Sequence, residues 1–513
     1  MLVETLVTDP TTAAGRRRVA SWAPWGAAVV VAFLVRLLPI LRGGGVHFYG
    51  RYDDGVYYAA ADALTFGRMP YRDFTLLHPP GGILALTPFA AIGRLTSDAA
   101  GMTLARLTFM LLGGIAAVLA GVLAARIGRD LGPARVIGPL AALLYACSPA
   151  AAYSEQTTFL EPIGGLLVLL ALLLLSRRAQ HSAVRIDLLA GLALGLACTV
   201  KIWYVAPAAA VVAAVLLDRR WDRRLISAMR LTAGGAVGLV LVLAPFVLTA
   251  PGDFWRMVVT DQLGRSATPH SRYDRLTSIV GTKTLAAGHP TLSAAITVIA
   301  VILAVGAVLL LIRERQLWPV IAVLLADVAV LFGAPSYFRH YGVLLAAPLA
   351  VVVACALGRL LGLVRVDAAR LVAVTVVAAL ALASGAAVAL GPTGKDKAFP
   401  PGAFARAPAL RCVASDDPAG LIQSNRLSAD LARGCPVAID VTGTSYGEAT
   451  PRHRNLRYQT WLVDYLLGSD AFVLLRPVKD GLTTAQLHRL QDQPTIARAG
   501  RLQLRAGSAA GHR

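Results

Sequence analysis

The sequence predicts a polytopic α-helical membrane protein that carries a small α/β domain at its carboxy-terminal end. Of its 513 residues, 56% are hydrophobic and 15% are charged, which is more apolar surface than a soluble protein of this length can bury. The arginines gather in short clusters between the apolar runs, which is the pattern of the positive-inside rule. The formal net charge of +20 is therefore interpreted as a topology signal, and a nucleic-acid partner is not expected.

The apolar runs predict about eleven membrane-spanning helices, because a helix needs about 20 apolar residues to cross the hydrocarbon core. The runs are 22–42, 100–125, 134–152, 159–176, 186–200, 203–217, 230–250, 291–312, 317–334, 341–358 and 370–390. No small-residue cleavage site follows the first run, so it is expected to be a retained helix and not a signal peptide.

Lys201 separates two short runs, 186–200 and 203–217, and this point decides the topology. If the two runs form a hairpin, every arginine cluster lies on the cytoplasmic side. The amino terminus of this plasma-membrane protein is then cytoplasmic and the carboxy-terminal domain faces outward. If the runs form one long helix, all later loops change sides. The hairpin is preferred, and it predicts three outer loops, which are residues 43–99, 251–290 and 335–340.

The first outer loop, residues 43–99, is long and belongs to a membrane module of residues 1–391. After Pro79-Pro80-Gly81-Gly82, an apolar stretch continues to Ile92. This stretch is too short to span a bilayer, so we expect it to lie in the membrane interface or to re-enter.

Residues 392–513 change character and predict a separate extracytoplasmic α/β domain after a Pro/Gly-rich linker. Cys412 and Cys435 could pair there, which would contribute roughly 3 kcal/mol, or they could remain free thiols. The expected strands are 411–414, 437–441 and 471–475, and the expected helices are 421–433, 456–467 and 484–490.

Two adjacent acids, Asp53 and Asp54, directly follow the first span. Carboxylates at the mouth of a membrane helix are costly to place near lipid, which makes them candidates for a functional site. The competing interpretation is that they are ordinary solvated loop acids.

The motifs around this acid pair carry a family resemblance. In order, they are Arg51-Tyr52-Asp53-Asp54-Gly55-Val56-Tyr57-Tyr58, Gly67-Arg68-Met69-Pro70-Tyr71-Arg72-Asp73-Phe74 and His78-Pro79-Pro80-Gly81. This order resembles the GT-C superfamily of multi-spanning glycosyltransferases, which use polyprenyl-phosphate sugars. The superfamily includes protein O-mannosyltransferases and actinobacterial cell-envelope mannosyl- and arabinosyltransferases. Beyond the first hundred residues the resemblance rests on hydropathy, on Tyr337-Phe338-Arg339-His340-Tyr341 and on the outward carboxy-terminal domain.

The resemblance implies an inverting transfer in which one carboxylate takes the proton from the acceptor hydroxyl. Asp53 aligns with the first acid of the family pair and is the preferred base, and Tyr57 follows it as in the family. Asp54 could instead be the base, orient the acceptor or bind a divalent cation such as Mg²⁺ or Mn²⁺. The residues alone do not separate these alternatives, so a divalent cation is the one cofactor left open.

Cations near the outer headgroups would stabilise a phosphate leaving group. Lys201 is the strongest candidate for such a cation because it lies deep between two apolar runs, although snorkelling to the headgroups would also explain its position. Arg339 and His340 form a possible second clamp or an interfacial anchor, and Arg265 is a weaker candidate.

Four further polar residues could have a functional or a purely structural role. Glu155 could assist in acceptor or metal binding, whereas Glu161 opens a helix, where the dipole alone favours an acid. His78 could bond sugar or phosphate, or be an interfacial turn residue. Asp73 is expected to cap local backbone amides.

The sequence therefore predicts a membrane glycosyltransferase that moves a sugar from a polyprenyl phosphate to an envelope glycan, glycolipid or protein. Mannose and arabinofuranose suit the Ala-, Gly- and Arg-rich composition of a GC-rich bacterium. The alternative is a transporter or flippase of lipid-linked sugars. That alternative predicts charges at mid-membrane depth and internal repeats, whereas here the candidate charges gather at one face.

Overall fold

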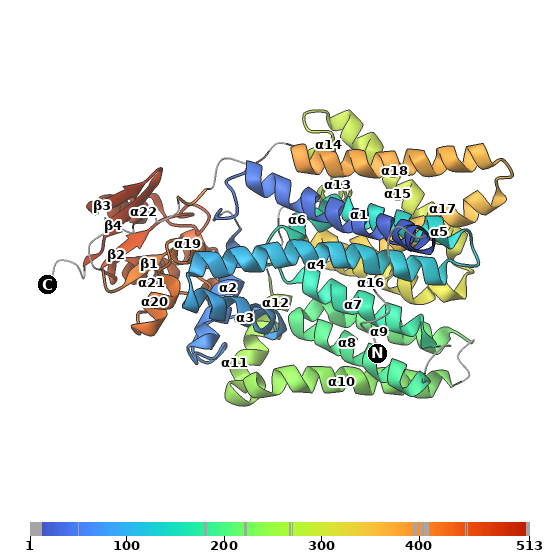
Figure 1. Ribbon diagram of the computed structural model, residues 1–513. Coiled ribbons are helices and arrows are strands. Elements are labelled where there is room, and N and C mark those ends of the chain that lie inside the picture. The colour runs from blue at the N-terminus through green and yellow to red at the C-terminus, as the bar shows by residue number, and fades with distance from the viewer. Residues whose placement is uncertain are drawn as a thin grey trace.

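The computed structural model describes residues 13–49, 51–178, 182–219, 223–265, 268, 270–391, 393, 398–400, 404, 410–446, 448 and 450–508, with side chains from Trp22 onward. Long helices form a bundle, and a smaller domain of strands and short helices packs on one end of it (Figure 1).

Within the described residues, eight helical segments are long and apolar enough to cross a membrane, and a bent pair raises the number to nine. The eight segments include α1 (Ala13–Arg42), α4 (Asp98–Ile127), α8 (Ala183–Val200), α10 (Arg224–Thr249), α15 (Pro290–Leu311), α16 (Trp318–Gly333), α17 (Ala346–Leu363) and α18 (Asp367–Leu390). The bent pair is α5 (Ala134–Ala146) with α6 (Pro149–Glu155), whose axes differ by 57°. Two shorter apolar helices, α7 (Glu161–Leu175) and α9 (Val205–Leu217), cover the remaining predicted runs, so the count of eleven spans stays a prediction.

The chain turns back at Lys201. This residue has an extended backbone and ends α8, after which the short helix η3 (Ile202–Tyr204) leads into α9. The two helices then run in opposite directions, as the predicted hairpin requires (Figure 1).

Glycines let α8 and α10 approach closely. A Cβ placed on Gly191 or Gly195 of α8 would overlap the backbone of α10 at Leu231 or Gly235. Small residues four apart allow such contact between membrane helices, where dispersion must replace the hydrophobic effect.

The segment predicted as the first outer loop, residues 43–99, contains α2 (Tyr52–Thr65) and α3 (Gly81–Leu95). Helix α2 lies between the membrane bundle and the carboxy-terminal domain, and a Cβ on its Gly55 would press on Ala419. Helix α3 buries one face and exposes Leu84, Ile92 and Leu95. It is too short to span, which agrees with the prediction of an interfacial segment.

The second outer loop, predicted only as a connection, contains a chain of short helices. They are α11 (Pro251–Trp255), the π-helical turn η4 (Arg256–Thr260), α12 (Asp261–Leu263), α13 (Arg272–Val280) and α14 (Thr282–Leu285). The third loop leads into η6 (Arg339–Leu345), which joins α17.

The carboxy-terminal domain has one four-stranded sheet in the order β1-β2-β4-β3. The first two strands pair in parallel, and the other two neighbours pair antiparallel. Its elements are β1 (Val413–Ser415), α19 (Pro418–Gln423), α20 (Leu427–Ala432), η7 (Gly443–Ser445), η8 (Arg452–Arg454), α21 (Leu456–Leu467), β2 (Ala471–Val473), α22 (Thr484–Gln491), β3 (Thr495–Ala499) and β4 (Leu502–Ala506). Cys412 and Cys435 form a disulfide, which decides between the two alternatives left open by the sequence.

Two expectations for this domain are wrong. Residues 437–441 are not a strand, because Asp440 bonds the backbone amide of Gly443 and bends the chain. The helix predicted over 421–433 is two helices, since Asn425 between them has a φ of 56°. The predicted linker lies largely outside the described residues.

Candidate active site

The two acids of the pair have different surroundings, because neighbouring residues on a helix point about 100° apart. Asp54 is fully buried. Its carboxylate forms an ion pair with Arg106 of α4 at 2.9 Å and accepts a hydrogen bond from Thr157. Arg106 also donates to the carbonyl of Val46 at 2.6 Å. Asp54 therefore ties α2 to the membrane bundle.

Asp53 faces a narrow pocket at the end of the bundle, and its side chain is 40% exposed. Protein surrounds the pocket, and this burial raises the pKa of Asp53 to about 6, while the positive charge of Arg265 opposes the rise. The pocket is lined by Tyr52, Asp53, Val56, Tyr57, Leu76, Leu77, His78, Arg265, Tyr341, Asp440, Thr442 and Tyr446.

A chain of polar and charged groups runs inward from Asp53. His340 Nε2 lies 3.9 Å from the carboxylate of Asp53 and 3.6 Å from Oε1 of Glu161. Glu161 in turn pairs with the ammonium group of Lys201. That ammonium group lies 4.1 Å from the centre of the Tyr341 ring. The lysine is 3% exposed, so it is held inside the protein and does not snorkel.

Arg265 also lines the pocket. Its guanidinium donates to the hydroxyl of Tyr446 at 2.7 Å and of Tyr341 at 3.4 Å. Both partners are neutral, so the positive charge of Arg265 stays available to the pocket.

His78 also faces the pocket, packed against the ring of Tyr57 with the ring centres 5.6 Å apart. Burial holds the pKa of His78 well below its ordinary value, which keeps the imidazole neutral. Its Nδ1 atom is buried and has no hydrogen-bond partner among the described residues. A buried polar atom of this kind requires explanation, and a bound ligand is one source of the missing bond.

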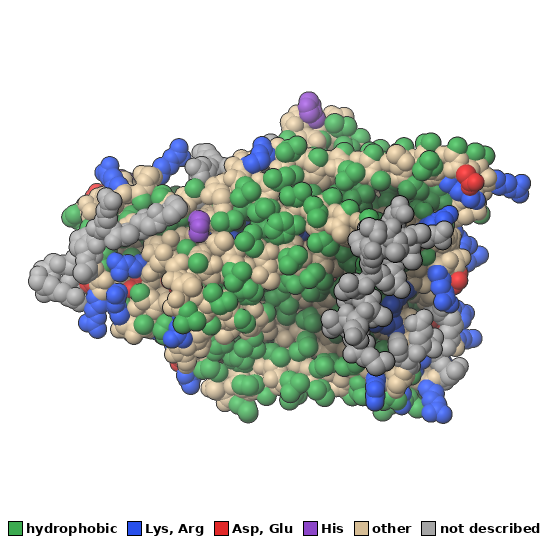
Figure 2. All heavy atoms as spheres, viewed as in Figure 1, with side chains coloured by type: hydrophobic (Ala, Val, Ile, Leu, Met, Phe, Trp, Pro, Cys, Tyr) green, Lys and Arg blue, Asp and Glu red, His purple; other side chains and the backbone are tan. Residues whose placement is uncertain are grey.

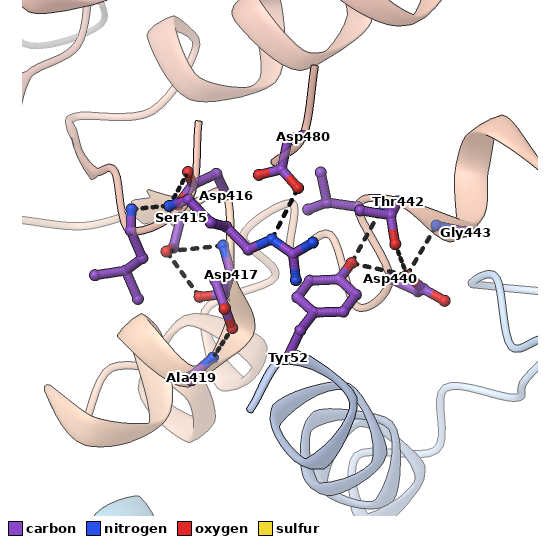
Figure 3. A network of polar contacts seen from close by, with 12 residues as sticks. Tyr52, Ser415, Asp416, Asp417, Ala419, Asp440, Thr442, Gly443 and Asp480 are labelled. Carbon is purple, nitrogen blue, oxygen red and sulfur yellow. Dashed lines mark hydrogen bonds and ion pairs between the residues drawn. The ribbon is translucent and has the colours of Figure 1, made fainter. Parts of the chain in front are cut away.

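The carboxy-terminal domain, predicted from the sequence to help hold the acceptor, completes the pocket through residues that the sequence did not single out. The hydroxyl of Tyr52 donates to Asp440 at 2.7 Å and accepts from the amide of Thr442 at 2.9 Å (Figure 3). The guanidinium of Arg476 stacks on the Tyr52 ring at 3.7 Å. The sequence signal was Asp440 with Thr442, Gly443 and Thr444, which begins at the end of the segment 437–441 that was mistaken for a strand.

Three other residues discussed from the sequence lie elsewhere. Glu155 is 1% exposed and forms an ion pair with Arg36 of α1, so it is not brought to the pocket. Arg339 stacks on Tyr153 at 4.3 Å and does not line the pocket. Asp73 accepts from the amide of Met69, which is the local role expected of it.

The surroundings of Asp54 do not fit a divalent cation. Its carboxylate already meets the guanidinium of Arg106, and no group of three His, Cys, Asp or Glu side chains that could hold a metal occurs in the described part of the chain. No step is therefore derived through a metal ion.

Residues 75–334 match the family model of glycosyltransferase family 87, which is half of the chain. The chain belongs to this family. The matched segment includes His78, Glu161, Lys201 and Arg265 and begins after the Asp53–Asp54 pair. A comparison with curated protein sequences finds no match.

This family 87 member shares its fold with solved GT-C structures. ArnT from Cupriavidus metallidurans superposes in its apo state with a TM-score of 0.60 and 15% identity, covering 98% of this chain and 99% of that one. The same protein bound to undecaprenyl phosphate gives 0.60 and 14%, covering 96% and 98%. The archaeal oligosaccharyltransferase AglB from Archaeoglobus fulgidus, in complex with an inhibitory peptide and a dolichol-phosphate, gives 0.52 and 12%, covering 90% and 70%. The protein is thus a multi-pass membrane glycosyltransferase of the GT-C superfamily, as the sequence predicted.

Proposed function

We propose that this family 87 member transfers a sugar from a polyprenyl-phosphate donor to an extracytoplasmic acceptor, with Asp53 as the general base. The observation that carries the proposal is that the two acids of the pair have different partners. Asp54 is already paired with Arg106, whereas Asp53 lines the pocket and has a pKa of about 6. A base with a pKa near the working pH is ionised and still accepts a proton effectively.

The reaction is a single inverting displacement. Asp53 takes the proton of the acceptor hydroxyl as its oxygen bonds to the anomeric carbon. The bond between that carbon and the phosphate oxygen breaks at the same time, and polyprenyl phosphate leaves with the electron pair. General-base assistance of this kind contributes about 10²–10⁴-fold in rate. Asp53 later releases its proton to water through the open side of the pocket.

The leaving phosphate needs positive charge and hydrogen-bond donors. Arg265 supplies a guanidinium at the pocket wall. Lys201 does not line the pocket and pairs with Glu161, so its contribution is to hold Glu161 in place beside His340. Support for a lipid donor comes from the similar structures that hold undecaprenyl phosphate and dolichol-phosphate.

The topology that accompanies this proposal has a cytoplasmic amino terminus and an outward carboxy-terminal domain. The arginine clusters between the helices support it. The sugar is a hexose or pentose, with mannose and arabinofuranose as the first to test. The acceptor is an envelope glycan, glycolipid or protein, and the carboxy-terminal domain helps to hold it through Asp440 and Thr442.

The experiment is sugar transfer by the purified full-length protein. Radiolabelled polyprenyl-phosphate mannose and arabinose are offered with envelope extract as acceptor, and a nucleotide sugar serves as the control donor. Transfer from a lipid-phosphate donor that is lost in Asp53→Asn supports the proposal. Transfer from the nucleotide sugar alone, or undiminished transfer by Asp53→Asn, contradicts it.

A further inference from the structure

A second cleft lies at the end of the bundle remote from the carboxy-terminal domain. It is an open cleft of about 550 Å³ between α4, α7 and α16. Arg106 of α4 pairs with Asp54 beside the pocket, and Arg126 of the same helix lines the cleft 20 residues later. At 1.5 Å per residue, these 20 residues span about 30 Å, so the cleft lies about the thickness of the hydrocarbon core from the Asp53 pocket (Figure 1).

The cleft combines apolar walls with a basic mouth. Leu123, Leu172 and Val320 are among its apolar lining residues. Its basic lining residues are Arg126, Arg129 and Arg178, of which Arg178 pairs with Asp187 at 3.0 Å. Lysine and arginine side chains gather at this end of the molecule (Figure 2). The one acid in the lining is Asp130, which lies 3.5 Å from Arg129 in an exposed pair.

Arg126 is the unusual residue of this cleft. Its Nη1 atom is buried and has no hydrogen-bond partner among the described residues. The neighbouring Arg177 has a buried Nε atom in the same condition, and the like charge of Arg177 acts on Arg126. Two adjacent guanidinium groups with unmet donors and no shared carboxylate are missing an anion.

Helix-end stabilisation explains only part of this arrangement. Arg126 lies in the last turn of α4, where a cation interacts favourably with the helix dipole. The dipole does not supply acceptors for buried N–H groups. Simple snorkelling into the headgroup layer would leave the guanidinium in water and would not need a cleft.

We propose that this cleft binds the phosphate headgroup of an anionic phospholipid in the leaflet opposite the Asp53 pocket. The guanidinium of Arg126 bonds the phosphate oxygens, Arg129 adds charge at the mouth, and the acyl chains lie along Leu123 and Leu172. The α16 amino terminus, at Trp318, adds its partial positive charge to the same site. Basic pockets between membrane helices suit lipid phosphates for these reasons. This site is separate from the proposed catalytic pocket and does not rest on it.

The test measures lipid retention by the full-length protein. Wild type, Arg126→Gln and Arg365→Gln are equilibrated with equal amounts of phosphatidylglycerol and phosphatidylcholine, and the retained lipid is counted by native mass spectrometry. Arg365 is exposed in the turn between α17 and α18 at the same end, so it is a matched control for charge. The expected result is that wild type and Arg365→Gln prefer phosphatidylglycerol. Arg126→Gln is expected to lose at least about ten-fold in that preference, because a bond to a charged partner is lost.

A second measurement uses wild type alone, in case Arg126→Gln folds poorly. Phenylglyoxal labelling of Arg126 is expected to be slower in phosphatidylglycerol nanodiscs than in phosphatidylcholine nanodiscs, while labelling of Arg365 is unchanged. Equal protection of both arginines would mean a diffuse headgroup effect and would overturn the proposal. Protection by inorganic phosphate as strong as by phosphatidylglycerol would overturn the assignment to a lipid.

Discussion

Replacing Arg265 by glutamine is expected to move the pH dependence of the reaction. Arg265 lowers the pKa of Asp53 against the effect of burial, and the balance leaves that pKa at about 6. At an effective dielectric constant near 20, a charge across a side-chain pocket is worth about 1–2 kcal/mol, which is about one pKa unit. Arg265→Gln should therefore raise the pKa of Asp53 to about 7.

The assay is the pH profile of kcat/KM for sugar transfer, which reports groups of the free enzyme. Activity requires ionised Asp53, so it rises with pH through the pKa. At pH 6 the ionised fraction of Asp53, and with it kcat/KM, should be about five-fold lower in the variant than in wild type. At pH 8 the two should be nearly equal, because ionisation is then nearly complete in both. Any loss of phosphate binding lowers the whole profile equally and leaves its midpoint unchanged.

Arg272→Gln is the control, because Arg272 is exposed on α13 in the same outer loop. Its profile should keep the midpoint of wild type. The reasoning is refuted if Arg265→Gln is folded and active but its acid limb keeps a midpoint near pH 6.

Three further predictions concern stability. Burial raises the pKa of Asp62 to about 7, so the folded protein binds more protons than the unfolded chain between about pH 4 and 7 and loses stability as the pH rises. Asp62→Asn removes this charge and should therefore raise the melting temperature more at pH 8 than at pH 5. An equal gain at both pH values would contradict the reasoning. Replacing Cys412 and Cys435 by serine should cost about 3 kcal/mol and expose the carboxy-terminal domain to protease, whereas unchanged cleavage would show that the disulfide is dispensable. Glu161→Gln and Lys201→Met each leave a buried charge unpaired and should each lower the free energy of unfolding by about 3–5 kcal/mol. In thermal melts, the double variant should lose less stability than the sum of the two single variants. A fully additive loss would argue against the ion pair.

Hydropathy predicted most of the membrane module, because the length of an apolar run is a local property. Each expected run lies on an apolar helix or helix pair. The α3 segment was also foreseen, since fifteen residues are too few to span. The β3–β4 hairpin was missed because the turn at Gly500 joins two short strands with only a weak alternation.

The site was predictable only where one residue carried the signal. The acid pair and Lys201 stood out because charges beside apolar runs are rare. The sequence could not separate Asp53 from Asp54, because the partner of Asp54 is Arg106, 52 residues away. The pairing of Glu155 could not be foreseen for the same reason, since its partner Arg36 lies 119 residues distant. The contribution of Asp440 depends on a domain contact across 388 residues, which local pattern does not reveal.

The central claim is that Asp53 reacts while Asp54 supports the structure. The direct test pairs the rate of sugar transfer with a thermal melt for Asp53→Asn and Asp54→Asn. Asp53→Asn should lose about 10²-fold or more in rate without any fall in melting temperature, since its side chain is open to the pocket and burial disfavours its charge. Asp54→Asn should melt earlier, by the equivalent of about 3–5 kcal/mol, because Arg106 is left buried without its charge partner. An active Asp53→Asn enzyme, or a stable Asp54→Asn enzyme with no turnover, would contradict the account.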